Sequence, residues 1–242
     1  SWPHRKDSIC AFIHRVDPDI IDMQEVLHHQ LEVLKTGLPE YTVVGVGRED
    51  GKTAGEYAPI FFKQAKYTLL DQNTFWLCEK PDSVGMVGWD AALTRIATWV
   101  KLQDKKTGQI LMVVNTHFDH IGTEARRNSA LLIIEKIKEI VGTSPAILTG
   151  DFNVSEDWDA YKTITNNEFI LKDAHKVAGK RTGVDFTYHN FGKIPAEKCE
   201  KIDFIFVTPQ IRVISSYIPF SQLNDTLFLS DHNPEIVELE IK

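Results

Sequence analysis

The feature that most constrains the fold is a set of three short apolar runs, each followed directly by Asp, Asn or His residues. The runs and the polar residues after them are 110–114 with Asn115, His117 and Asp119, 146–149 with Gly150, Asp151 and Asn153, and 227–229 with Asp231 and His232. A short apolar run between turn residues predicts a buried strand. Strand side chains alternate, so Asp151 and Asn153 should point the same way. Buried carboxylates and amides are costly unless paired or bound.

The run at 146–153 alone is equally consistent with a turn, because Asp and Asn are common there. Its recurrence in three places favours one polar site at the edge of a sheet. Such a site is typical of phosphoester hydrolysis or metal binding.

Helical spacing and stop signals predict four helices, and short apolar or alternating runs predict the strands. The expected helices are 6–16, 27–37, 124–141 and 155–166, the last capped by Ser155. The expected strands are 20–24, 41–46, 58–62, 67–70, 92–103, 109–115, 146–149, 201–208, 211–217 and 237–241. Strands outnumber helices and several neighbours form hairpins. We therefore expect an α+β fold, with two mixed β-sheets packed face to face and helices outside.

Composition narrows the class of protein. The 242 residues carry a net charge of −7, with 43% hydrophobic and 25% charged residues, which fits a single globular domain over 1–242. We expect no membrane span, no clear duplex-DNA surface and a monomer. Three cysteines predict neither disulfides nor a zinc site. The sequence leaves the cellular location undecided: the protein is cytoplasmic or, if a leader was removed, periplasmic or secreted.

Seven polar residues at predicted strand ends form the candidate site: Glu25, His117, Asp151 with Asn153, Asp203, Asp231 and His232. A lone surface Asp or His is usually structural, but seven unrelated ones are improbable. Asp203 lies in an otherwise apolar strand and needs a partner, for which histidine is suitable. Oxygen-rich ligands without paired cysteines favour Mg²⁺, with Mn²⁺ as the alternative. Such an ion assists attack of water on a phosphoester.

Three alternative classes of protein match parts of the sequence. The segment 115–120 is similar to the HxHxDH motif of metallo-β-lactamase-like hydrolases, but Asn115 replaces its first histidine. Calcineurin-like phosphoesterases also use a Gly-Asp step, but the chain has no early DxH and no GNH. A catalytically silent binding protein could keep the fold. The sequence has neither a GxSxG elbow nor a Walker loop, so no motif supports acyl transfer or nucleotide binding.

Taken together, the motifs resemble the endonuclease/exonuclease/phosphatase superfamily, whose fold is DNase I-like. The motifs in order are 17–25 (DPDIIDMQE), 115–117 (NTH), 150–153 (GDFN), 202–205 (IDFI) and 230–234 (SDHNP). The resemblance implies a four-layered α/β-sandwich and hydrolysis of a phosphodiester or phosphomonoester. The expected substrate is a small phosphate ester or single-stranded nucleic acid. Residues 75–77 and 88–90 resemble bacterial relatives of the deadenylase/nocturnin branch.

By position, the resemblance implies that Glu25 is the main Mg²⁺ ligand, with Asp231 nearby, bound directly or through water. It further implies that Asp151 and Asn153 orient the attacking water and contact the phosphate.

The same resemblance implies that His232 is the catalytic histidine, paired with Asp203, and that His117 contacts the phosphate. We expect Glu56 to partner His117 and Arg95 to contact the phosphate. The roles of four further residues near the site in the sequence stay open: Asp119, His120, Arg126 and Arg127.

The chain departs from the superfamily at its start. The resemblance implies a strand ahead of Ser1, ending in an Asn that helps build the metal site, and this chain has no such strand. We expect either that the segment has been removed or that the site is incomplete.

Overall fold

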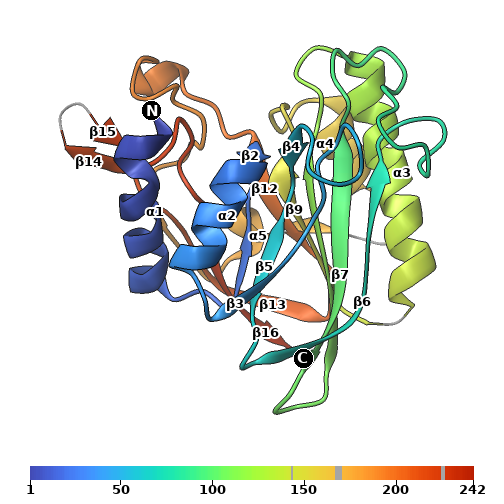
Figure 1. The fold of residues 1–242 in the computed structure, drawn as a ribbon, viewed down its shortest axis with the longest axis horizontal. Coiled ribbons are helices and arrows are strands. Elements are labelled where there is room, and N and C mark those ends of the chain that lie inside the picture. Colours follow the sequence, from blue (N-terminus) through green and yellow to red (C-terminus); the bar gives the residue numbers. More distant parts are fainter. Residues whose placement is uncertain (143, 167–170, 225–226) are drawn as a thin grey trace.

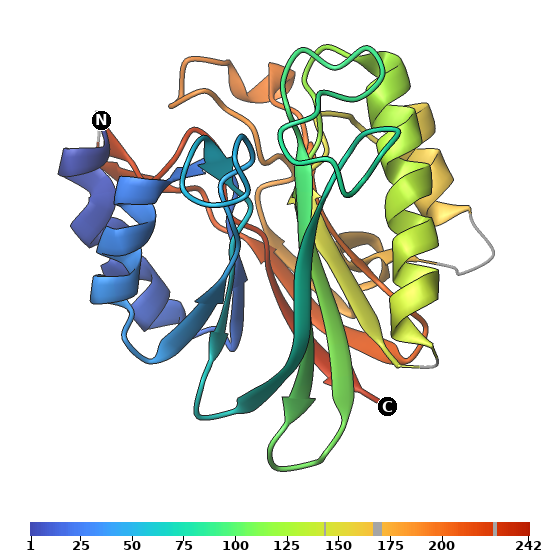
Figure 2. The same cartoon turned by 45° about the vertical axis from the view of Figure 1, so that its right-hand side comes forward.

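The computed structural model describes residues 1–142, 144–166, 171–224 and 227–242. Its helices and strands form four layers. Figures 1 and 2 show α1 and α2 on one outer side, two β layers in the middle, and α3 with α4 on the other outer side. This arrangement is a DNase I-like α/β-sandwich, as the sequence predicts. No helix in the described part of the chain is long and apolar enough to cross a membrane.

The helices are α1 (Trp2–Val16), α2 (His28–Gly37), α3 (Thr123–Val141), α4 (Asp159–Thr165) and α5 (Ala174–Val177), with a 3₁₀ turn at Ala196–Lys198. The strands are β1 (Ile20–Asp22), β2 (Val26–Leu27), β3 (Tyr41–Val44), β4 (Glu56–Tyr57), β5 (Ile60–Lys63), β6 (Tyr67–Trp76), β7 (Ile96–Asp104), β8 (Ile110–His117), β9 (Ala146–Asp151), β10 (Lys172–Asp173), β11 (Lys180–Gly183), β12 (Asp203–Val207), β13 (Ile211–Ile218), β14 (Gln222–Asn224), β15 (Leu227–Phe228) and β16 (Ile236–Ile241).

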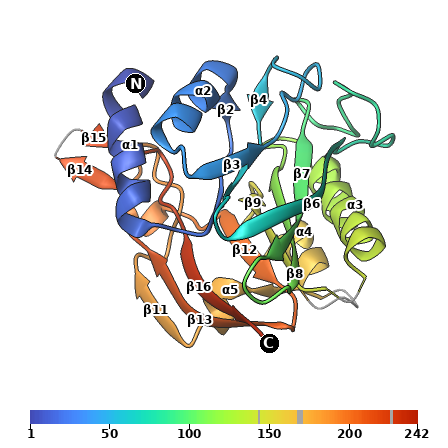
Figure 3. The same cartoon turned by 60° about the horizontal axis from the view of Figure 1, so that its bottom comes forward.

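One β layer is a six-stranded sheet in the order β10-β12-β9-β8-β7-β6. Within it β8 and β9 run parallel, joined by α3, and the other neighbours are antiparallel. The facing layer contains two three-stranded sheets, β1-β5-β3 and β11-β13-β16. The second of these lies at the front of Figure 3. Because β8 and β9 are parallel, their carboxyl ends meet at one edge of the sheet.

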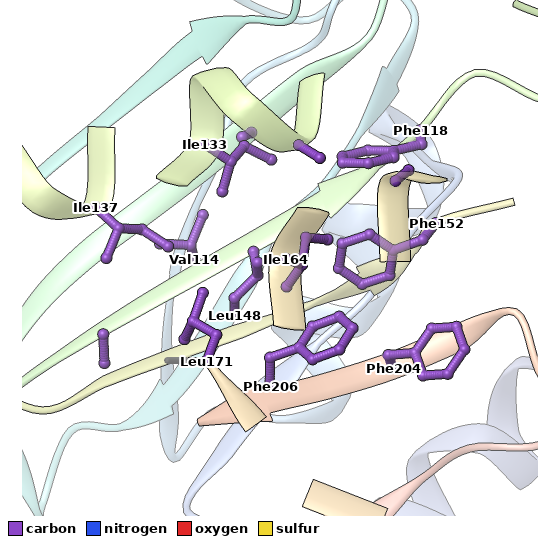
Figure 4. Packing of buried hydrophobic residues seen from close by; sticks show 14 of the residues in the cluster. Val114, Phe118, Ile133, Ile137, Leu148, Phe152, Ile164, Leu171, Phe204 and Phe206 are labelled. Carbon is purple, nitrogen blue, oxygen red and sulfur yellow. The ribbon is translucent and has the colours of Figure 1, made fainter. Parts of the chain in front are cut away.

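Residues of the six-stranded sheet alternate between two cores. Met112, Leu148 and Phe206 pack toward α3 and α4. Val113 and Ile147 face the smaller sheets. In the first core, Phe152 meets Phe118, Phe204 and Phe206 with ring centroids 4.9, 6.1 and 5.2 Å away (Figure 4). This aromatic cluster fixes the end of β9, where Asp151 and Asn153 flank Phe152.

A cleft of about 620 Å³ separates the two smaller sheets. Strand β1 is an edge of one of them and β16 is an edge of the other. The cleft is lined by Ile20 and Ile21 of β1, Ile236 and Val237 of β16, and apolar side chains of α1. It continues to the ends of β9 and β12.

Several predicted elements have other bounds in the structure; for example, the strand predicted at 92–103 is Ile96–Asp104. Two of the differences have a clear cause. Ser155 does not cap α4, which begins at Asp159; the Ser155 hydroxyl instead donates to Asp157 at 2.7 Å. The strand expected at 67–70 continues to Trp76, because a bulge after Leu69 restores its pairing with β7.

Candidate active site

Five candidate residues share one face at one edge of the six-stranded sheet. His117 and Asp151 are register partners at the ends of β8 and β9. Asp203 begins β12 directly opposite Asp151. On their strands, all three lie an even number of residues from the side chains that face the smaller sheets. They therefore point into the space between the two β layers. The other two, Asn153 and His232, come from the loops after β9 and β15.

His232 and Asp203 form a close polar pair in the site. Nδ1 of His232 lies 2.7 Å from Oδ2 of Asp203. Burial would lower the pKa of His232, but Asp203, Asp151 and Asp231 overcome this and raise it to about 10. Burial also raises the pKa of Asp151, and the adjoining Asp203 raises it further. At neutral pH the imidazole therefore keeps its proton, and the Asp151 carboxylate, in its ionised form, is a stronger base than an ordinary carboxylate.

Asn233 holds the loop that carries His232. Its backbone N–H donates to Thr187 O at 2.7 Å, and its side chain joins Ser221 N and Phe186 O at 2.9 and 3.2 Å. The ring of Tyr188 packs against the imidazole, with centroids 4.9 Å apart. These contacts limit the rotation of His232.

A second histidine lies on the other side of Asp151. Burial, with Arg95 and Arg48 nearby, lowers the pKa of His117 well below its usual value, so its imidazole is neutral. The amide nitrogen of Asn153 lies 3.1 Å from Nε2 of His117 and donates to it. Asn153 has a φ of 50°, which is rare outside glycine. Its own N–H donates to Asp151 at 2.9 Å and maintains this geometry.

Arg95 lies just before β7 and is 4% exposed. Its Nη2 donates to Nδ1 of His120 at 3.2 Å, and its Nε lies 3.5 Å from Asp119. Nη1 is buried and has no hydrogen-bond partner among the residues described. A buried guanidinium with an unused donor suits an anionic ligand. Asp119 is itself fixed by backbone N–H groups of Leu93, Ile121 and Gly122.

Glu25 follows β1 with a φ of 60°, another unusual backbone angle held at the site. Its carboxylate has no hydrogen-bond partner in the described part of the chain. Partial burial raises its pKa first, and the carboxylates of Glu56 and Asp231 raise it further. Glu25, Glu56, Asp231 and His232 all line the cleft between the smaller sheets.

The expected pairing of Glu56 with His117 is wrong. Glu56 forms a tight ion pair with Arg48, a buried residue that sequence reasoning missed. A guanidinium attracts a carboxylate more strongly than a neutral imidazole does. Arg48 stands alone between Gly47 and acidic residues in a polar loop, and that isolated cation was the available signal. Trp76 fixes the loop through its Nε1, which donates to Arg48 O at 2.7 Å.

The donor set fits a hard divalent cation. Glu25 offers a carboxylate without a partner, and two further acids lie near enough to raise its pKa. A cation would relieve this repulsion. A second candidate is Asp151, Asp203 and His232, with ligand atoms within 4.8 Å of one another. We favour the group around Glu25 as the cation site, because Asp203 and His232 already form a hydrogen bond with each other.

Asn115 and Asp119 are occupied in ways that oppose the metallo-β-lactamase alternative. Asn115 is fully buried and donates to Met23 O and Pro59 O, at 2.7 and 2.9 Å. It joins the two β layers. With Asp119 bound to backbone N–H groups, neither residue is available to a metal.

A protonated histidine held by a carboxylate, a basic buried carboxylate, and guanidinium and amide donors share one sheet edge beside a group of acids. Together with the fold, these features define a phosphoric ester hydrolase. The sequence model of the Endonuclease/Exonuclease/phosphatase family matches residues 1–232, and the chain belongs to this family. Members of the family use divalent metal ions.

Solved structures include close relatives. The endonuclease/exonuclease/phosphatase protein of Bacteroides vulgatus is 62% identical, with a TM-score of 0.97 over 100% of this chain and 92% of that one. A mannosyl-6-phosphatase of Bacteroides thetaiotaomicron is 36% identical, with a TM-score of 0.93 over 100% and 92%. The human nocturnin catalytic domain shares the fold, at 18% identity and a TM-score of 0.79 over 100% and 88%.

Proposed function

We propose that this chain hydrolyses a phosphomonoester of a small molecule by metal-assisted attack of water on phosphorus. The observation that carries the proposal is the His232–Asp203 pair set against the basic carboxylate of Asp151. A histidine that keeps its proton beside a carboxylate of raised basicity provides a general acid and a general base for one reaction. The mannosyl-6-phosphatase relative supports a monoester, because it is 36% identical along the whole chain.

In this proposal each residue has one task. Asp151 takes a proton from the attacking water, while His232 donates its proton to the oxygen of the departing group. The new bond joins the water oxygen to phosphorus, the ester P–O bond breaks, and phosphate and an alcohol leave. Asn153, His117 and Arg95 hold the phosphoryl oxygens by hydrogen bonds.

A divalent cation, held by Glu25 with Asp231 nearby, would neutralise charge on the phosphoryl oxygens. We expect Mg²⁺, with Mn²⁺ as a substitute, because the donors are oxygens.

The test compares His232→Ala with the unaltered chain on a chromogenic phosphomonoester and a chromogenic phosphodiester, each with Mg²⁺ and with EDTA. Removing a general acid should lower kcat by about 10²–10⁴. His29→Ala, on the exposed surface of α2, is the matched control and should retain full turnover.

Three results would contradict the proposal. Near-normal turnover of His232→Ala would remove this residue from the mechanism. Preference for the diester would overturn the monoester assignment. No turnover of either substrate by the unaltered chain, with Mg²⁺ bound, would indicate a silent binding protein.

A further inference from the structure

A second pocket, of about 720 Å³, lies between the start of α3 and the loop that leads into α4. Figure 2 shows these helices side by side on the outer face of the six-stranded sheet. None of its lining residues has a role in the proposed mechanism. We propose that this pocket binds a neutral sugar ring, the alcohol part of the phosphomonoester or a neighbouring sugar of the same chain. This inference rests on the proposed function for its substrate class.

The pocket adjoins the catalytic residues. Val154 lines it and directly follows Asn153. Arg126 also lines it, and its Nη1 donates to the backbone oxygen of Asp119 at 2.9 Å. The Asp119 carboxylate, in turn, lies 3.5 Å from Arg95. Asp119 thus joins Arg126 of the pocket to Arg95 of the active site.

Trp158 provides a flat surface in the pocket. It is 42% exposed, and Arg126 lies over its ring, 5.0 Å from the centroid. Trp158 ends a turn that begins at Ser155, through its N–H to Ser155 O. An exposed indole held in place by a cation suits the C–H face of a sugar, because the ring offers apolar area with little loss of rotamer freedom.

Arg126 points to a polar ligand. It is 4% exposed, yet its Nε is buried and has no hydrogen-bond partner among the described residues. Leaving such a donor unsatisfied costs free energy. A sugar hydroxyl would give this donor an acceptor if the ligand shifted the guanidinium, and the sugar ring would lie on the part of Trp158 that stays exposed.

The charge of the lining excludes a polyanion. Four acids, Asp90, Glu124, Asp157 and Asp159, outnumber the two arginines, Arg126 and Arg127. A nucleic-acid strand needs a basic groove along its phosphates. A neutral ring with many hydroxyls can instead bind here, because carboxylates accept hydrogen bonds from hydroxyls and guanidiniums donate hydrogen bonds to them.

The test measures KM and kcat for a hexose 6-phosphate and for p-nitrophenyl phosphate, which lacks a sugar. Trp158→Ala should raise KM for the hexose phosphate by about three- to tenfold, the usual effect of losing one aromatic contact. Its kcat/KM for p-nitrophenyl phosphate should not change. Trp158→Phe should restore most of the lost affinity, and Tyr217→Ala, an exposed aromatic on β13, should change neither substrate.

Saturation-transfer NMR with an unphosphorylated methyl hexoside gives a second readout that does not need turnover. Transfer should occur with the unaltered chain and be lost in Trp158→Ala. Equal effects of Trp158→Ala on both substrates, or sugar transfer that survives this change, would overturn the sugar assignment. If the unaltered chain hydrolyses no phosphomonoester, the proposed function fails, while the NMR experiment still decides whether the pocket binds sugar.

Discussion

At the scale of single residues, Glu25 combines a strained backbone with a carboxylate that lacks a partner. Its φ of 60° is unusual for a side chain of this size. Strain of this kind persists when the surrounding structure fixes it. Here Met23, two residues earlier, donates its N–H to Pro59 O at 3.2 Å, and β2 follows at once. The backbone thus aims the carboxylate into the cleft.

We predict that Glu25→Gln weakens Mg²⁺ binding by at least about tenfold, the lower end of the effect of losing even a supporting group at a metal site. Calorimetric titration with Mg²⁺ measures this. Because Gln keeps the size and removes only the charge, the melting temperature should change little. Glu139→Gln, which makes the same change on the exposed face of α3, is the control. Unchanged Mg²⁺ affinity would mean that Glu25 is not a ligand.

The site residues most visible in the sequence were those at the ends of strands. Asp151, Asp203 and His117 could be predicted because each is a polar residue at the end of an apolar run, where it needs a partner or a ligand. Arg48 could not, since its place depends on the loop that Trp76 holds. The partner of His117 could not be predicted from the sequence either, because the Asn153 side chain reaches His117 only through the positive φ of Asn153.

At the scale of elements, the parallel pair of β8 and β9 depends on Gly150. A Cβ placed there would lie 2.3 Å from the backbone oxygen of Thr116, its register partner on β8. Backbone atoms in the middle of a sheet cannot move aside without disturbing their hydrogen bonds. The glycine thus permits the close strand approach that brings His117 level with Asp151.

We predict that Gly150→Ala destabilises the fold by about 1–3 kcal/mol, the usual cost of an added group in a packed core. Chemical denaturation gives the free energy of unfolding. Gly108→Ala is the control, because a Cβ there meets nothing within 4 Å, although its φ of 75° carries a cost of its own. If Gly150→Ala proves no more destabilising than Gly108→Ala, the close approach does not explain the glycine.

Long elements with a clear period were predictable, and short ones were not. The spacing of Ile133, Ile137 and Val141 defines α3 in the sequence alone. Strands of two residues, such as β2 and β4, have too few side chains to show a period. They exist because Val26 and Tyr57 lie opposite each other once the loops are folded. Helix α5 is four residues long and depends on its cap, Asp173, which accepts from His175 N and Lys176 N.

At the scale of the whole molecule, the cleft between β1 and β16 separates two sheets that otherwise lie in one layer. Each strand presents an edge without a strand partner among the described residues. Inside the cleft, Oδ1 of Asp22 is buried and has no hydrogen-bond partner there, and burial raises the pKa of this carboxyl to about 7. An open slot with apolar walls, two strand edges and an unused acceptor is a costly arrangement.

One extended segment between β1 and β16 would satisfy both edges and join the two sheets. Its side chains on one face would cover Ile20 and Val237, and a donor on it could reach Asp22. Since the cleft also contains Glu25 and Asp231, the same segment would stiffen the side of the site where we propose that the metal binds. The Bacteroides vulgatus protein matches over 92% of its length, so it carries residues beyond the matched part.

We predict that a longer chain, extended ahead of Ser1 by a strand-forming segment, places an extended strand in this cleft. It should melt at a higher temperature and bind Mg²⁺ more tightly than residues 1–242, because paired strand edges and a satisfied Asp22 remove unpaired polar groups from the interior. Thermal melting and metal titration of the two chains, side by side, measure both effects. Asp22→Ala, made in both chains, serves as the control for the buried acceptor: without this oxygen the added segment has one hydrogen bond fewer to make, so the gain should be smaller. Equal melting temperatures and equal affinities would show that the cleft is stable when open and that the site is complete without the strand.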